Sequence, residues 1–271
     1  MKASSVCASL GVVLLLCACV DTSTTEATDG MGGSSGTSNQ SGGGGQASGG
    51  AAGGDDPGGL ASFELVVIGS STAAGEGASA PSNGWVALLD EALEQTVATS
   101  FSSTNLAVGG YSTESLMPGS ASAGNIDDAI ELEPNLILVA LAGSNDLSAG
   151  VSGETFMSRL TTIRDSAVAA GIPVFFLSTA PKDLSTDERE ALRDWAESMA
   201  ESFGSCWVPE SPSYAPCFVD VFGLLANSSL GIREELGAGD GIHLNDAGHA
   251  AIFDEVEAIV TPYVCRATDC F

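Results

Sequence analysis

The sequence predicts an α/β fold in which a parallel sheet lies between two layers of helices. From about residue 61 onward, short apolar runs alternate with longer segments of helical periodicity. The inner runs are apolar on both faces, which is typical of parallel strands that helices cover on both sides. We therefore expect one three-layer α/β/α domain over residues 61–271.

Strands and helices are expected to alternate along this domain. The strands are residues 63–69, 104–108, 136–143, 172–179 and 217–223. The helices are residues 84–97, 154–171, 189–204 and 245–264. Gly171 closes the second of these helices, and Ser185 with Glu188 forms a capping box before the third.

The N-terminus has the composition of an export signal. Lys2 precedes an apolar run that is too short for a stable membrane span, so residues 1–18 are expected to be a signal peptide. The run ends in LCAC, which resembles the lipobox of bacterial lipoproteins. That resemblance implies cleavage before Cys19 and a lipid anchor on Cys19, and an ordinary cleaved signal is the alternative.

Residues 19–60 comprise this cysteine and a Gly/Ser-rich segment with no lysine, arginine or aromatic residue. Such a segment cannot bury enough apolar surface to fold, so we expect a flexible tether. The protein would then be exported and held at a membrane of the bacterial cell envelope, on the periplasmic face or at the cell surface.

The charge of the chain limits its partners. Its 35 acidic and 8 basic residues give a net charge of −27 at pH 7. Nucleic acid is therefore not expected as a partner, because phosphate binding needs basic clusters. Anionic polymers and anionic lipid surfaces are disfavoured as substrates for the same reason.

Four cysteines lie in the last third of the chain, where export makes disulfides plausible. Three pairings are conceivable, and we predict bridges between nearest neighbours, Cys206 with Cys217 and Cys265 with Cys270. Zinc binding is the weaker alternative, since neither pair has the spacing of a zinc knuckle.

Serines, glycines and an asparagine gather where the first three expected strands end. Ser70 and Ser71 follow the first strand, Gly109 and Gly110 the second, and Asn145 the third. In open parallel sheets, ligands bind beyond the carboxyl ends of the strands, so these residues are candidates for a site.

Only two histidines, His243 and His249, could serve a serine nucleophile as its base. Asp240 lies three residues before His243 in a Gly-rich loop, where a tight turn would bring its carboxylate to the ring. His249 is expected to be a partly buried residue of the last helix. A metal site of Asp240, His243 and His249 is disfavoured, because the spacing of the histidines fits no helical pair of ligands.

Four segments together resemble the blocks of the GDSL or SGNH hydrolase family: VVIGSSTAAG, NLAVGG, LVALAGSND and DGIHLNDAGH. They occur in the family's order over almost all of residues 63–250. The resemblance implies a flavodoxin-like sandwich with a five-stranded parallel sheet and an esterase mechanism without a metal or organic cofactor. It makes Ser71 the nucleophile, His243 and Asp240 the base and its orienting acid, and Ser71, Gly110 and Asn145 the oxyanion hole.

Some of these residues have simpler explanations. Ser71 alone could be a helix N-cap, and Asp146 is expected to cap a helix or form an Asx turn. Residues 32–36, GGSSG, match the G-x-S-x-G elbow but lie in the tether, so we exclude them. Where the family usually has Asp, this chain has Ser70, whose hydroxyl could replace part of the lost hydrogen bonding.

The expected substrate is a neutral extracellular ester, such as an acetylated polysaccharide or a small short-chain acyl ester. The alternatives are a lipase or lysophospholipase of the same family, and a non-catalytic binding lipoprotein that retains the fold. Loops 111–135, 147–153 and 206–217 are expected to shape the pocket, with Trp207 and Tyr214 as sugar platforms or as packing aromatics. The sequence leaves open the acyl length, ester or thioester chemistry, the membrane that holds the anchor and the oligomeric state.

Overall fold

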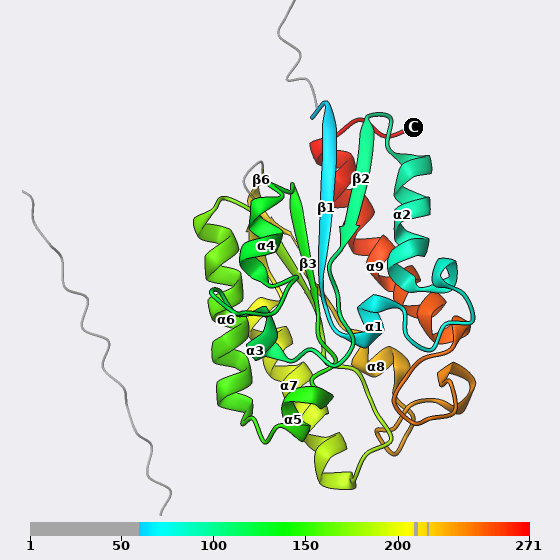
Figure 1. Ribbon diagram of the computed structural model, residues 1–271. Coiled ribbons are helices and arrows are strands. Elements are labelled where there is room, and N and C mark those ends of the chain that lie inside the picture. The colour runs from blue at the N-terminus through cyan, green and yellow to red at the C-terminus, as the bar shows by residue number, and fades with distance from the viewer. Residues whose placement is uncertain (1–59, 209–210, 216) are drawn as a thin grey trace, which may run out of the picture. The chain divides into compact units, whose positions relative to one another are not determined.

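In the computed structural model, residues 60–208, 211–215 and 217–271 are described, and a sheet of five parallel strands forms their centre (Figure 1). The strands are β1 (Ser62–Gly69), β2 (Ser100–Asn105), β3 (Leu136–Ala140), β4 (Val174–Leu177) and β7 (Phe218–Val219). The predicted α/β fold with a parallel sheet is confirmed. The predictions for residues 1–59, namely the signal peptide, the lipidation of Cys19 and the tether, lie outside the described residues.

The strand order is β2-β1-β3-β4-β7, which is the flavodoxin-like order with its switch point between β1 and β3. Gly69 at the end of β1 pairs with Ala140 at the end of β3. The segments that leave these two strands therefore start side by side at the carboxyl edge of the sheet. They carry Ser71 and Asn145.

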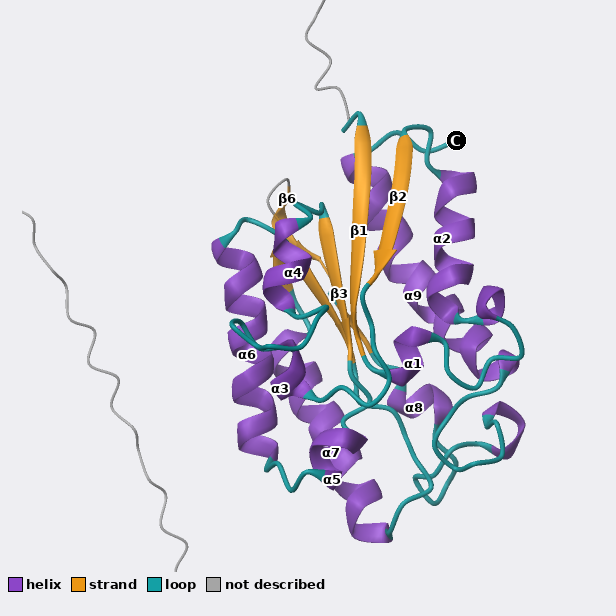
Figure 2. Ribbon diagram, viewed as in Figure 1, coloured by secondary structure: helices purple, strands orange, loops and turns teal. Residues whose placement is uncertain are grey.

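Alternate residues of the strands face two separate cores. In β1, Leu65 and Val67 pack towards α2 (Trp85–Thr96) and α9 (Asp246–Ala267). Val66 and Ile68 pack in the second core, on the other face, which α4 (Ile126–Glu131), α6 (Gly153–Ala169) and α7 (Thr186–Phe203) cover (Figure 2). All four side chains are 0–1% exposed, because a parallel strand between two helix layers has no solvent face.

Several short elements follow the strands or precede α9. They are α1 (Ser71–Ala74), η1 (Pro81–Asn83), α3 (Thr113–Leu116), α5 (Ser144–Ser148), α8 (Phe222–Leu225) and η2 (Glu234–Leu236). The capping box of Ser185 and Glu188 at the start of α7 is present as predicted. No helix in the described part of the chain combines the length and the apolar character needed to cross a bilayer.

Four strand predictions were wrong in extent. β3 ends at Ala140 rather than at residue 143, and β4 covers Val174–Leu177 rather than residues 172–179. β2 and β7 differ more. β2 covers 100–105 rather than 104–108, because it is an edge strand that is partly exposed and therefore has a weak apolar pattern. β7 is limited to Phe218 and Val219, because the chain turns into α8 directly afterwards. The Ser178 hydroxyl and the Asp220 carboxylate accept hydrogen bonds from the amides at the start of α8 and stabilise this turn.

The segment between α7 and β7 contains a hairpin that the sequence did not predict, formed by β5 (Cys206–Val208) and β6 (Ser211–Ala215). It joins the end of α7 to the start of β7, so it lies at the amino edge of the sheet, as Figure 1 shows for β6. The expectation that loop 206–217 shapes the pocket was therefore wrong. The side chains of Trp207 and Tyr214 are outside the described residues.

A disulfide joins Cys265 and Cys270, with an S–S distance of 1.98 Å, as predicted. It links the end of α9 to the last residues of the chain. Cys217 is also disulfide-bonded. The side chain of Cys206, its predicted partner, is outside the described residues.

Candidate active site

Ser71 is the first residue of α1, directly beyond the carboxyl end of β1. The turn into this helix requires Gly69, because a Cβ there would overlap the carbonyl oxygen of Ala140 on the neighbouring strand. Gly75 ends the helix in the left-handed region at φ +86° and donates its N–H to the Ser71 carbonyl. Ser71 as a whole is 8% exposed, so it lies near the surface of the sheet edge rather than on a free loop.

Main-chain hydrogen bonds hold the turn that carries Ser71. The Ser70 amide donates to Ala140 O at 3.2 Å, and Ser70 O accepts from the amides of Ala73 and Ala74 at 3.0 Å each. The Ser70 hydroxyl is buried and makes no hydrogen bond within the described part of the chain. The prediction that this hydroxyl replaces part of the hydrogen bonding of the family's Asp was therefore wrong.

Gly110 lies in the loop after β2 and Asn145 in α5, and the two segments are linked. Gly110 has φ +82°, and a Cβ added there would meet no atom within 4 Å. Asn145 Nδ2 donates to the carbonyl of Tyr111 at 2.8 Å, so α5 holds the loop after β2. Val108 N in turn donates to Gly69 O at 3.2 Å, which joins the same loop to the end of β1.

Asp146 strengthens this link and does not form the predicted cap or Asx turn. Its buried carboxylate accepts hydrogen bonds from the amide and the hydroxyl of Thr113, the first residue of α3. Burial raises the pKa of Asp146, while the bonds from Thr113 and the charge of Arg159 oppose that rise. The expectation failed because the partner comes from a distant loop rather than from neighbouring residues.

His243 and Asp240 form the pair that their spacing predicts. His243 Nδ1 lies 2.6 Å from Asp240 Oδ2. Asp240 Oδ1 accepts the amides of Ile242 and His243 at 2.8 and 2.7 Å, and these bonds lower the pKa of the carboxylate. Gly239 and Gly241, at φ +93° and +75°, give the loop the sharp bend that this geometry needs.

The other ring nitrogen of His243 faces a residue that the sequence reasoning missed. His243 Nε2 lies 3.1 Å from Oε2 of Glu76, and no hydrogen bond joins Ser71 Oγ to His243 among the described residues. Carboxylates thus flank both nitrogens of the ring. A signal was available, because Glu76 is an acidic residue between two glycines immediately after the serine turn.

Lys182 is the second residue that sequence reasoning missed. It is 1% exposed and follows the end of β4, and its Nζ donates to the carbonyl of Ile242, next to His243. Asp183 N donates to Gly241 O at 2.8 Å, so consecutive residues hold the catalytic loop. Burial lowers the pKa of Lys182 to about 8, against the charges of Asp240 and Glu76. The signal was its rarity, since Lys2 is the only other lysine in the sequence.

His249 is a buried residue of α9, in line with its expected place in the last helix. Its Nε2 donates to the carbonyl of Glu76 at 3.2 Å, and its Nδ1 accepts the amide of Trp85 at 3.5 Å. Burial lowers the pKa of His249, which favours the neutral ring that this pattern requires. Within the described ranges, no group of three or more His, Cys, Asp or Glu side chains is arranged to hold a metal ion.

Solved structures share this fold at low sequence identity. The psychrotrophic esterase EstA from Pseudoalteromonas sp. is 18% identical with a TM-score of 0.53, and the match covers 74% of this chain and 98% of that one. A protein described as lipolytic and of the G-D-S-L family, from Desulfitobacterium hafniense, is 15% identical with a TM-score of 0.56, over 73% and 99% of the two chains. TesA is 20% identical with a TM-score of 0.52, over 73% and 98%.

No curated protein matches the chain. The model of the GDSL-like Lipase/Acylhydrolase family matches residues 67–251. This range is more than half of the chain and contains Ser71, Gly110, Asn145, Asp240 and His243. The chain therefore belongs to the GDSL-like lipase/acylhydrolase family, and it is a hydrolase that acts on ester bonds.

Proposed function

We propose that the protein is an exported, lipid-anchored serine esterase that removes short acyl groups, such as acetyl, from carbohydrate or small esters. The observation that carries the catalytic part is the Asp240–His243 pair, held at the sheet edge where Ser71 begins α1. The carboxylate orients the imidazole and stabilises its protonated form, as a base for a serine requires.

In the first half of the reaction, Glu76 leaves Nε2 of His243 and the free nitrogen takes the proton of the Ser71 hydroxyl. Glu76 is able to move because its side chain is 48% exposed. Ser71 Oγ attacks the ester carbonyl, and the carbonyl oxygen becomes an oxyanion. When the intermediate collapses, the C–O bond to the alcohol breaks and His243 gives its proton to the leaving alcohol oxygen.

Three donors are proposed to stabilise the oxyanion: the amides of Ser71 and Gly110, and the side-chain amide of Asn145. An asparagine side chain has two N–H donors, and Asn145 uses one of them for the Tyr111 carbonyl. The other makes no hydrogen bond to a described residue and is proposed to donate to the oxyanion, so that one residue would both hold the loop and contact the reacting atom.

In the second half, water attacks the acyl group on Ser71 while His243 takes a proton from the water. The ester bond to Ser71 then breaks, His243 returns its proton to Ser71 Oγ, and the acid leaves. Each proton passes through His243 Nε2, so these steps need no metal or organic cofactor.

The preference for short acyl groups rests on how little apolar surface adjoins the site. The large hydrophobic side chains that are well exposed in the described part of the chain are Val108, Leu132, Val168 and Phe271. Only Val108 belongs to a loop of the site. A long acyl chain would need a larger apolar surface, so the lipase or lysophospholipase alternative is less favoured.

Export and anchoring are proposed from the sequence of residues 1–60. The signal peptide, Cys19 and the Gly/Ser-rich tether would keep the hydrolase domain near a membrane but free to reach substrates around it. Metabolic labelling with palmitate in a bacterial host tests this, with Cys19→Ala as the unlabelled control. Equal labelling of both proteins would contradict the anchor.

Hydrolysis of p-nitrophenyl esters from acetate to decanoate by the purified full chain tests the esterase itself. We expect the highest kcat/KM for acetate and its loss in Ser71→Ala and His243→Ala. A maximum at long chains would favour a lipase. If the wild type is folded but its turnover is no higher than that of the two variants, a non-catalytic binding protein would be favoured.

A further inference from the structure

The Glu76 carboxylate lies between the base and the loop of the proposed oxyanion hole. Its Oε2 is 3.1 Å from His243 Nε2. Its Oε1 packs against Gly109, where an added Cβ would overlap it. The side chain is 48% exposed, and that of His243 is 24% exposed, so both border the open part of the site.

The backbone of Glu76 is held so that this side chain faces His243. Its amide donates to the carbonyl of Ser71 at 2.9 Å, and its carbonyl accepts from Nε2 of the buried His249 at 3.2 Å. The next residue, Gly77, has φ +93°, and a Cβ there would overlap the carbonyl of Leu244. Rotation of the side chain can therefore move the carboxylate away from Nε2, but the residue stays at the edge of the site.

If the protein is the esterase proposed above, the position of Glu76 affects which alcohol parts of a substrate fit beside His243. His243 Nε2 gives its proton to the leaving alcohol oxygen, so that oxygen must come within hydrogen-bond distance of Nε2. Glu76 occupies this place in the free protein. We propose that Glu76 selects esters by the charge of their alcohol part and disfavours alcohols with a negative group close to the ester bond.

The other charges around His243 Nε2 also disfavour an anionic alcohol part. Asp240 lies on the other side of the His243 ring, 2.6 Å from Nδ1. Lys182 is a cation whose charge interacts with both carboxylates. It is buried with its Nζ on the Ile242 carbonyl and therefore does not reach an alcohol in the open site. A cationic alcohol part would be attracted by the Glu76 carboxylate, and the hydroxyl groups of a neutral polyol could donate hydrogen bonds to it.

Three acetate esters with the same two-carbon spacer test the proposal at neutral pH and fixed low ionic strength. They are acetylcholine, its neutral isostere 3,3-dimethylbutyl acetate, and 3-acetoxypropanoate. If the chain-length series favours another acyl group, the three esters carry that group. For the wild type we expect kcat/KM to be highest for the cationic ester and lowest for the anionic one.

Glu76→Gln keeps the shape of the side chain and removes its charge. We expect the ratio of kcat/KM for the cationic over the anionic ester to fall about tenfold. The neutral ester separates this loss of selectivity from a general loss of activity. Glu76→Asp, which keeps the charge, should retain most of the ratio. Glu201→Gln is the matched control, because it removes one charge from an exposed position at the end of α7, remote from the site.

The outcomes separate this proposal from the esterase function. The role of Glu76 would be overturned, and the esterase function left intact, by either of two results. One is a cationic-to-anionic ratio of kcat/KM in Glu76→Gln equal to that of the wild type, and the other is a fall of this ratio in Glu201→Gln as large as that in Glu76→Gln. Loss of the neutral ester in both Glu76 variants would make Glu76 part of the catalytic machinery and also overturn selection by charge. A wild type that hydrolyses p-nitrophenyl esters but none of the three esters would overturn selection by charge, and one that hydrolyses neither set would contradict the esterase function itself.

Discussion

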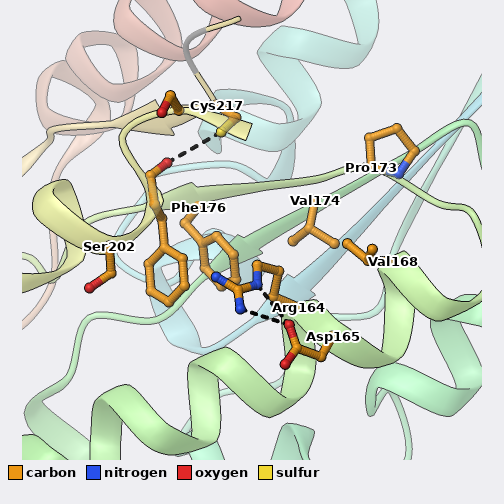
Figure 3. Close-up of a pocket in the computed structure, with 10 residues that line it drawn as sticks. Arg164, Asp165, Val168, Pro173, Val174, Phe176, Ser202 and Cys217 are labelled. Atoms are coloured by element: carbon orange, nitrogen blue, oxygen red, sulfur yellow. Dashed lines mark hydrogen bonds and ion pairs between the residues drawn. The ribbon is translucent and has the colours of Figure 1, made fainter. Parts of the chain in front are cut away.

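The two edges of the central sheet are built differently, although the same five strands end at both. At the carboxyl edge, the loops bring together Ser71, Glu76, His243 and the buried Lys182. At the amino edge, a cavity of about 320 Å³ is lined by apolar side chains such as Val174, Phe176 and Phe203 (Figure 3). Arg164 also lines it, stacks over the Phe203 ring at 5.6 Å and pairs with Asp165.

A sizeable cavity therefore does not mark the position of the catalytic groups in this protein. The described lining of the amino-edge cavity includes Asp165, Ser202 and Ser205 but no histidine that could serve a serine as its base. The carboxyl edge has these groups because successive βα connections of a parallel sheet all start there. Changes at the carboxyl edge should therefore alter turnover, and changes at the amino edge should alter stability.

The sharpest contrast is expected between two adjacent serines at the carboxyl edge. Ser71→Ala should lower kcat/KM by about 10⁴-fold or more, because the nucleophile is removed. Ser70→Ala should change kcat/KM by no more than a few-fold and leave the melting temperature equal or slightly higher, because the buried Ser70 hydroxyl makes no hydrogen bond to a described residue. Ester kinetics and thermal melts measure both. A large loss of activity in Ser70→Ala would show that the assignment to Ser71 is wrong.

At the amino edge, Phe203→Ala should reduce stability by about 3–5 kcal/mol. Phe203 is 3% exposed and stacks on Phe176 with ring centroids 4.4 Å apart. Urea unfolding measures the loss, and kcat/KM of the folded variant should equal that of the wild type. If Phe203→Ala reduced turnover but left the unfolding midpoint unchanged, the proposed difference between the two edges would be wrong.

At the carboxyl edge, Asn145→Ala should lower kcat by about 10²–10³-fold, because one oxyanion donor is lost. Stability should fall much less than in Phe203→Ala, since the link to Tyr111 is one hydrogen bond. Single-turnover kinetics of the acylation step provide the measurement. A change in KM with kcat unaffected would instead assign Asn145 to substrate binding.

Lys182→Met should lower kcat roughly tenfold, which is less than the loss in Asn145→Ala, because the Ile242 carbonyl beside His243 loses its donor. The stability of the variant relative to the wild type should depend on pH. The pKa of Lys182 is about 8 in the folded protein and near 10.5 when unfolded, a difference that corresponds to about 3 kcal/mol.

Between pH 8 and pH 10.5, Lys182 binds more protons in the unfolded wild type than in the folded one. The free energy of unfolding of the wild type therefore gains a contribution from Lys182 that increases with pH. The variant lacks the contribution. Relative to the wild type, the free energy of unfolding of Lys182→Met should be most favourable below pH 8. This advantage should shrink as the pH approaches 10.5. Urea unfolding of both proteins at pH 7 and pH 10 gives the comparison, and a constant difference would contradict the role of burial.

Much of the fold and part of the site could be predicted because the signals are local. Apolar runs between helical segments predicted the parallel sheet, and the capping box at Ser185 predicted the start of α7. The i, i+3 spacing of Asp240 and His243 predicted their hydrogen bond, since a Gly-rich turn brings such neighbours together. β2 was misplaced because an edge strand needs few apolar residues.

The order of the main strands and helices along the chain, the position of Ser71 after the first strand and the pairing of Asp240 with His243 could be read from the sequence alone. Each depends on residues that are close along the chain, where periodicity and turn chemistry decide the geometry. Three features became visible in the folded domain: Glu76 faces His243, Lys182 is buried under the catalytic loop, and the Ser70 hydroxyl makes no hydrogen bond to any described residue. These depend on how α1, the end of β4 and the loop before α9 pack together, because contacts between distant segments follow from the packing of the whole domain and leave no spacing in the sequence.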